Sequence, residues 1–132
     1  MTPFGERVRT LRNERGVTQA DMAAALGVSP AYLSALEHGR RGRPTWVLVQ
    51  RVIGYLNVIW DEAEELQRLA EVSHPRVTVE TAGLGADATR LANRLAETVS
   101  ILDPEDVRRL LADLEASAAR AEAERRARRG RR

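Results

Sequence analysis

The sequence predicts an all-α protein with five short helices in about the first 73 residues and two more toward the C-terminus. Two observations predict this fold class. Apolar residues recur three or four positions apart along most of the chain, a spacing that places them on one face of a helix. Serine, threonine, proline and glycine interrupt these stretches where helices begin and end. A short extended piece is expected only at residues 77–79, which read Val-Thr-Val.

The first two helices are short and end at glycines. The first follows Pro3 and stops at Gly16, and its apolar residues are Phe4, Val8 and Leu11. Thr18 is a good N-cap for the second helix, because its hydroxyl can accept a hydrogen bond from a free backbone N–H. Gly27 permits a left-handed turn at the end of that helix. The apolar residues of the second helix are Met22, Ala23 and Leu26.

The next three helices complete a compact N-terminal domain. Ser29 can cap the third helix, and Pro30 at its first position gives up a donor that would be unpaired anyway. This helix turns Leu33 and Leu36 inward and ends at Gly39, and a basic loop follows. The fourth helix carries Trp46, Val49, Val52, Ile53 and Leu56, and the fifth carries Trp60, Ala63, Leu66 and Leu69. Because both tryptophans fall within apolar stripes, we expect them to pack in the core.

The dipeptide His74-Pro75 breaks the fifth helix and places a domain boundary there. We therefore expect a domain over residues 1–74, a linker with two C-terminal helices over residues 75–124, and a flexible arginine-rich tail over residues 125–132. The tail has no apolar face to bury and is expected to fray. The C-terminal helices carry an apolar stripe that exceeds what a five-helix domain needs. Its leucines, expected to mediate dimerisation, are Leu91, Leu95, Leu102, Leu110 and Leu114.

Charge is strongly segregated along the 132 residues, although the formal net charge is only +2. Residues 1–60 carry 8 arginines and 4 acidic residues, residues 61–119 carry 6 and 13, and residues 120–132 carry 7 and 2. The acidic middle is a poor partner for phosphate, so we expect nucleic acid to meet the N-terminal segment. Three roles stay open for the terminal arginines: a nonspecific DNA arm, a partner-binding segment or a solubilising end. The chain has no cysteine, no signal-peptide pattern and no apolar run of membrane-spanning length, which favours a cytoplasmic, nucleoid-associated protein.

The segment from Gln19 to Leu36 has the spacing that a helix-turn-helix requires. Ala23 is small where the two helices cross, and Gly27 lies at the turn. An ordinary helical hairpin also needs such residues, but it does not need a small, polar outer face on its second helix with arginines nearby. The stretch RVRTLRNERGVTQADMAAALGVSPAYLSALEHGRRGRP, from Arg7 to Pro44, resembles the phage-repressor-like (Xre/Cro-type) helix-turn-helix regulators, and a weaker likeness continues to Leu69.

The resemblance implies a five-helix, λ-repressor-like DNA-binding domain in which the helix beginning at Ser29 lies in the major groove. It implies a helix cap at Thr18, a phosphate-binding glutamine at Gln19, and an ion pair between Arg12 and Glu37. It also implies base-proximal residues at Pro30, Ala31 and Ser34, with Tyr32 directed to the DNA backbone. The phosphate-side donors would be His38, Arg40, Arg41 and Arg43. Pro30 and Ala31 offer only apolar contact, so we expect discrimination between bases to depend on DNA shape, on paired half-sites or on an arginine that reaches the minor groove.

Other chemistries find little support in the sequence. His38 and His74 are far apart in the chain and lack clustered carboxylates, so neither a metal site nor a histidine-based catalytic set is expected. The glycines at 83 and 85 lack the rest of a phosphate-binding loop. We expect no enzyme activity and no cofactor.

The predicted function is that of a DNA-binding transcriptional regulator, favoured as a repressor, that binds a palindromic double-stranded operator as a homodimer. Two alternatives remain open. The C-terminal helices could pack on their own N-terminal domain, or the C-terminal half could bind a partner protein, as in an antitoxin-like adaptor.

Overall fold

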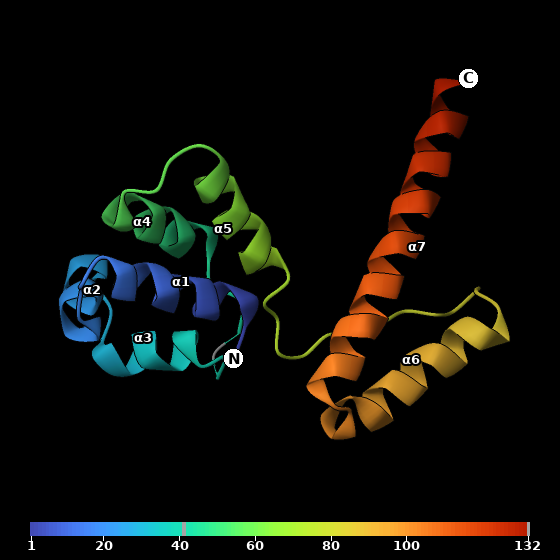
Figure 1. Cartoon of the computed structure of the whole chain (residues 1–132), viewed down its shortest axis with the longest axis horizontal. Coiled ribbons are helices and arrows are strands. Elements are labelled where there is room, and N and C mark those ends of the chain that lie inside the picture. The colour runs from blue at the N-terminus through green and yellow to red at the C-terminus, as the bar shows by residue number, and fades with distance from the viewer. Residues whose placement is uncertain (41, 132) are drawn as a thin grey trace. The chain divides into compact units, whose positions relative to one another are not determined.

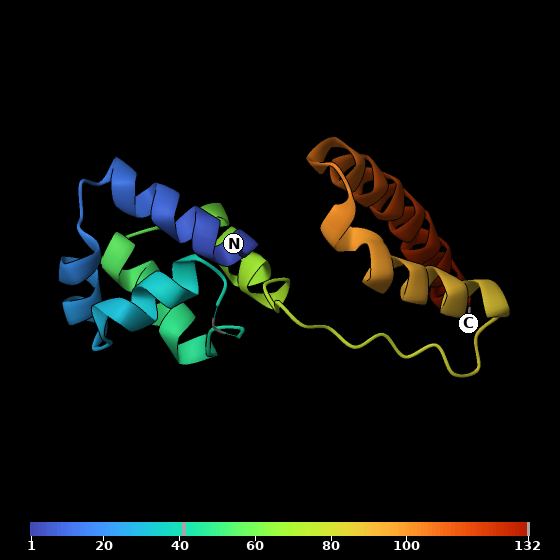
Figure 2. The same cartoon turned by 90° about the horizontal axis from the view of Figure 1, so that it is seen from below.

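The chain is all-helical in the computed structural model, which describes residues 1–40 and 42–131. Within these ranges there is no strand, and the predicted all-α class is confirmed. The elements are α1 (Pro3–Glu14), α2 (Gln19–Leu26), α3 (Pro30–Glu37), α4 (Trp46–Leu56), α5 (Asp61–Glu71), α6 (Ala86–Thr98), the 3-10 helix η1 (Val99–Ile101) and α7 (Pro104–Gly130). The chain divides into two units between Thr78 and Val79 (Figures 1 and 2), four residues beyond the boundary expected at residue 74.

The first unit is built around α1. This helix packs against α3, α4 and α5, while α2 packs against α3 and α4 (Figure 2). The core of the unit contains apolar residues from all five helices: Phe4, Val8, Leu11, Met22, Ala23, Leu26, Leu33, Leu36, Leu48, Val49, Val52, Leu56, Val58, Leu66 and Ala70. Burial of these side chains supplies the main favourable free energy of folding for the unit. Leu48, Val58 and Ala70 were not predicted, whereas the predicted Ile53, Ala63 and Leu69 are only partly buried.

The two tryptophans are exceptions, and the expectation that they pack in the core is wrong. Trp46 is 72% exposed and Trp60 is 81% exposed. Trp46 is the first residue of α4, and helical Cα–Cβ bonds tilt toward the N-terminus, so its side chain extends beyond the start of the helix. Trp60 precedes α5 and has φ 54° and ψ −124°, a backbone conformation that favours glycine. Because this backbone is not helical, the Trp60 side chain does not follow the apolar face of α5.

A serine that the sequence analysis did not single out closes the first unit. Ser73 is buried, and its hydroxyl accepts a hydrogen bond from Phe4 N at 2.9 Å and donates to Leu69 O. The end of α5 is thereby joined to the first turn of α1, 69 residues earlier. Ser73 therefore joins the C-terminal end of the first unit to its N-terminal helix.

The second unit contains α6, η1 and α7, and no described side chain in it is buried. The leucines predicted for dimerisation are exposed at 91, 95, 110 and 114, and Leu102, which follows η1, is half-buried. Residues 77–79 have no regular structure, so the short extended piece expected there is not a strand.

The tail expected to fray beyond Glu124 is helical instead. Helix α7 continues without a break through the arginine-rich segment to Gly130. Alanine, arginine and glutamate are among the strongest helix formers, and arginines in the last turn interact favourably with the helix dipole. The absence of an apolar face therefore did not prevent helix formation, because local propensity favours it here.

Candidate nucleic-acid interface

The turn between α2 and α3 follows from three local interactions predicted by the sequence. The hydroxyl of Thr18 accepts a hydrogen bond from Asp21 N at 3.1 Å and caps α2. Gly27 adopts φ 74° at the end of α2, the left-handed conformation that glycine tolerates without strain. The hydroxyl of Ser29 then caps α3 by accepting from Tyr32 N at 3.0 Å. The two helix starts are therefore fixed by side-chain caps, and the turn between the helices by the backbone conformation of Gly27.

Helix α3 presents different chemistry on its two sides. Its inner side, Leu33, Leu36 and Glu37, is buried against the core. Pro30 and Ala31, predicted to lie near the bases, are exposed, and Ser34 is half-buried. Tyr32 is half-buried and packs against the core cluster, so its ring is partly structural. An exposed side of small residues lets another surface approach the helix closely.

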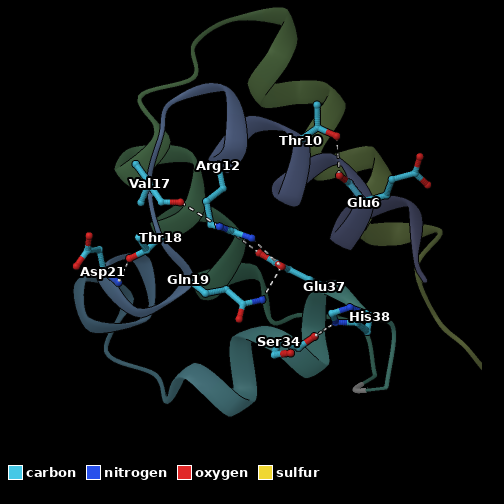
Figure 3. A network of polar contacts seen from close by, with 10 residues as sticks. All are labelled: Glu6, Thr10, Arg12, Val17, Thr18, Gln19, Asp21, Ser34, Glu37 and His38. Carbon is cyan, nitrogen blue, oxygen red and sulfur yellow. Dashed lines mark hydrogen bonds and ion pairs between the residues drawn. The ribbon is translucent and has the colours of Figure 1, made fainter.

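A buried ion pair connects α1 to α3, as the sequence predicted (Figure 3). Arg12 Nε donates to Glu37 Oε1 at 2.9 Å, and Arg12 Nη2 donates to Glu37 Oε2 at 3.4 Å. The side chains are only 12% and 1% exposed, respectively. Arg12 Nη1 also donates to Val17 O at 3.0 Å, which ties the pair to the segment that leads into α2. The guanidinium therefore holds three elements of the domain together.

Gln19 has a contact that the sequence analysis did not foresee. Its Nε2 donates to Glu37 Oε2 at 2.8 Å (Figure 3), so the carboxylate accepts from both Arg12 and Gln19. Gln19 is half-buried at the start of α2. The bond orients the amide and leaves its carbonyl oxygen and second N–H without a bond to the protein among the described residues.

The same network borders a hollow of about 480 Å³. It is lined by Arg9, Arg12, Asn13, Gly16, Val17, Thr18, Gln19, Glu37 and His38. Arg9 and Asn13 were not predicted as site residues, although both are polar residues on the last two turns of α1. Their helical spacing of four, which places them on one side of α1, is the signal that sequence reasoning missed.

The segment after α3 carries the other predicted donors. His38 is exposed, and its Nδ1 donates to Ser34 O at 2.7 Å, which leaves Nε2 as the remaining ring nitrogen. Arg40 and Arg43 are exposed. Arg41 lies outside the residues that the structure describes.

A close approach of two backbones sets the position of α3 against α1. A Cβ added at Gly5 would lie 2.6 Å from the carbonyl oxygens of both Leu36 and Glu37. Only glycine permits this distance without displacing one of the helices. The contact places the end of α3 directly against the first turn of α1.

A family model described as a helix-turn-helix domain matches residues 3–69, half of the chain. The chain belongs to this helix-turn-helix family. The regulator RamB of Mycobacterium tuberculosis is 38% identical over 73 residues, which cover 54% of this chain and 15% of RamB. The repressor RghR of Bacillus subtilis is 36% identical over 61 residues, 46% of this chain and 45% of RghR. The chain thus spans less than half the length of these relatives.

One shorter relative is covered almost throughout. The HTH-type transcriptional regulator YazB of Bacillus subtilis is 37% identical over 59 residues, 45% of this chain and 84% of its own. These matches confirm the predicted membership in the Xre-type helix-turn-helix regulators. A solved structure, the SinR protein/SinI protein complex, aligns over 88% of this chain and 98% of its own with a TM-score of 0.42 and 22% identity.

The described part of the chain, residues 1–40 and 42–131, has neither a membrane-spanning helix nor a cluster of metal ligands. None of its helices there is long and apolar enough to cross a membrane. Over the same residues, no three histidine, cysteine, aspartate or glutamate side chains come together as metal ligands.

Proposed function

We propose that the protein is a sequence-specific, double-stranded DNA-binding transcriptional regulator that inserts α3 into the major groove. The observation that carries the proposal is the exposed, small-residue side of α3, on a helix whose opposite side is held by the buried pair of Arg12 and Glu37. A helix that reads a groove must be held rigidly, and the small residues at the start of α3 let it approach the base edges closely. Membership in the helix-turn-helix family supports the same docking.

In this proposal the residues around α3 bind phosphates and do not read bases. The free N–H groups at the start of α2, together with Gln19, bind one phosphate, and the bond from Gln19 to Glu37 orients the amide for it. Further phosphate contacts come from Thr18, His38, Arg40, Arg41 and Arg43. Ser29, Pro30, Ala31 and Ser34 then lie nearest the base edges, and Tyr32 lies toward the DNA backbone.

We further propose that the protein acts as a homodimeric repressor on a palindromic operator in the cytoplasm, in association with the nucleoid. A single short recognition helix covers few base pairs, and two of them on a two-fold axis give useful specificity. The exposed leucines of α6 and α7 supply an apolar surface for the second copy. The relative RghR is named as a repressor, which supports that direction of regulation. No enzyme activity is proposed.

The same exposed leucines favour a second candidate, an adaptor of antitoxin type whose C-terminal half binds another protein. Purification from the native cell separates the two. A stoichiometric second protein supports the adaptor, and a pure homodimer supports the regulator.

The decisive experiment separates base reading from phosphate binding. A preferred duplex is first selected by the protein from a random library, and its affinity is compared with that of a scrambled duplex over a range of salt concentrations. Arg43→Ala should weaken both duplexes similarly and lower the salt slope by about 0.9 per lost contact and subunit. Ser34→Ala should change the preference by at most about 1–3 kcal/mol and leave the slope nearly unchanged, whereas Ala31→Glu should abolish the preference. If Ala31→Glu leaves the ratio of the two affinities intact, α3 is not the reading helix.

A further inference from the structure

The C-terminal part of α7 is a strongly basic helix. Six arginines and two glutamates occupy residues 120–131, and all but the last of these residues lie within the unbroken helix (Figure 1). At 1.5 Å per residue the segment is about 18 Å long. We name residues 120–131 the basic segment of α7.

The arginines of the basic segment form no ion pair with any residue that the structure describes. Among the residues that the structure describes, no carboxylate lies within ion-pair distance of any of them. Arg120 donates only to the hydroxyl of Ser117, at 3.2 Å. The available glutamates, Glu122 and Glu124, are four residues before Arg126 and Arg128, yet neither pair is formed. The positive charge is therefore fully available to a partner.

The helix gathers four of these arginines on one side. At about 100° per residue, Arg125, Arg126, Arg128 and Arg129 fall within about 160° of the helix circumference, an arc that also contains Glu122, whereas Arg120 lies on the opposite side. Like charges three and four residues apart repel each other, as Arg125 does with Arg128 and Arg129. A polyanion bound along this side would relieve that repulsion, whereas a single small anion would relieve only part of it.

We propose that the basic segment of α7 makes a second, sequence-independent contact with duplex DNA, in addition to the contact made by the helix-turn-helix. The inference rests on the proposed function, because that function brings a duplex to the same chain. Only 14 residues, Val72 to Gly85, separate α5 from α6. Fully extended they span at most about 50 Å, so a duplex bound by the first unit is present at high effective concentration for the second. Duplex DNA presents one phosphate charge per about 1.7 Å of its axis, so several arginines along one helix can each meet a phosphate.

The test uses the full-length chain and a random-sequence duplex. The variant replaces Arg125, Arg126, Arg128 and Arg129 with glutamine, a residue that keeps high helix propensity. A matched control replaces four exposed arginines of the same unit, Arg90, Arg94, Arg108 and Arg109, with glutamine, so that both proteins lose the same net charge. Circular dichroism verifies that both variants keep the helix content of the unmodified protein.

The expected result is a smaller salt dependence for the first variant alone. The slope of log affinity against log salt should fall by about 0.9 for each arginine that contacts a phosphate, and by at most about 3.6 per chain. The preference for a selected duplex over a scrambled one should persist, because base reading belongs to α3. Equal slopes in the unmodified protein and the first variant, or an equal fall in the control, would overturn the proposal.

Two further arms separate the possible partners and the two proposals. Vesicles of phosphatidylserine and phosphatidylcholine, and polyglutamate, replace the duplex in otherwise identical titrations. Loss of binding to either probe with unchanged binding to DNA would assign the basic segment to a membrane or an acidic protein and overturn the inference. If the unmodified protein prefers a selected duplex but the slope is unaffected, only this inference fails. If it binds no duplex, the proposed function fails first.

Discussion

Neutralising Glu37 tests whether the buried pair holds the recognition helix. Glu37→Gln keeps the shape of the side chain but removes the charge and one of its two acceptor oxygens. In the structure the carboxylate accepts two bonds from Arg12 and one from Gln19. In the Gln variant only the amide oxygen can accept hydrogen bonds from these three donors, and the NH2 group is turned toward at least one of them. Arg12 is then left charged and only 12% exposed.

The expected loss of unfolding free energy is about 3 kcal/mol, near the lower end of the 3–5 kcal/mol typical for breaking a buried pair. The lower end applies because Arg12 keeps its bond to Val17 O and some contact with water. With a urea m value of about 1–3 kcal/mol per molar, the midpoint should fall by roughly 1–3 M. Urea titration followed by circular dichroism measures this shift.

Two control variants accompany the measurement. Glu97→Gln breaks the pair of Glu97 with Arg94, whose side chains are 62% and 64% exposed, and should cost at most about 1 kcal/mol. The double variant Arg12→Gln with Glu37→Gln should recover part of the loss, because no unpaired charge remains buried. A Glu37→Gln midpoint equal to that of the unmodified protein would refute the reasoning, since the pair would then contribute nothing to stability.

Three further predictions concern packing, assembly and backbone strain. Gly5→Ala should destabilise the protein by about 1–3 kcal/mol, because its Cβ would meet two backbone oxygens at 2.6 Å. The matched change Gly54→Ala, within α4 and with open space at its Cβ, should stabilise by about 0.5–1 kcal/mol, and equal denaturation midpoints for the two variants would contradict this account. A fragment of residues 1–78 should be folded but monomeric, and a dimer in light scattering at micromolar concentration would show that α6 and α7 do not mediate assembly. Trp60→Gly should raise the thermal midpoint, because the strain at φ 54° and ψ −124° costs about 1–3 kcal/mol; a lower midpoint would mean that the exposed ring packs favourably.

Local signals were sufficient to predict the helix starts and the turn of the helix-turn-helix. Thr18 and Ser29 cap the helices that follow them, and Gly27 adopts the left-handed conformation, as the sequence predicted. These features involve residues a few positions apart, so the sequence contains all the information they need. The roles of the exposed residues in binding DNA remain predictions.

Periodicity alone could not predict the environment of residues at the ends of helices. It placed Trp46 and Trp60 in apolar stripes, yet both side chains are exposed, because their positions at helix starts carry them past the core. Composition also failed for the arginine-rich end of α7, where helix propensity outweighed the lack of a buried face.

By itself the sequence determined the helical class and the capped turn, and the family resemblance supplied the pairing of Arg12 with Glu37. Only the tertiary structure decided how α1, α2 and α3 meet. The bond from Gln19 to Glu37, the contact of Gly5 with the end of α3, and the bond from Phe4 N to Ser73 join residues 18, 32 and 69 positions apart. Such contacts depend on the angle and distance at which packed helices cross, and these are set by the fit of many side chains together, so no local pattern specifies them.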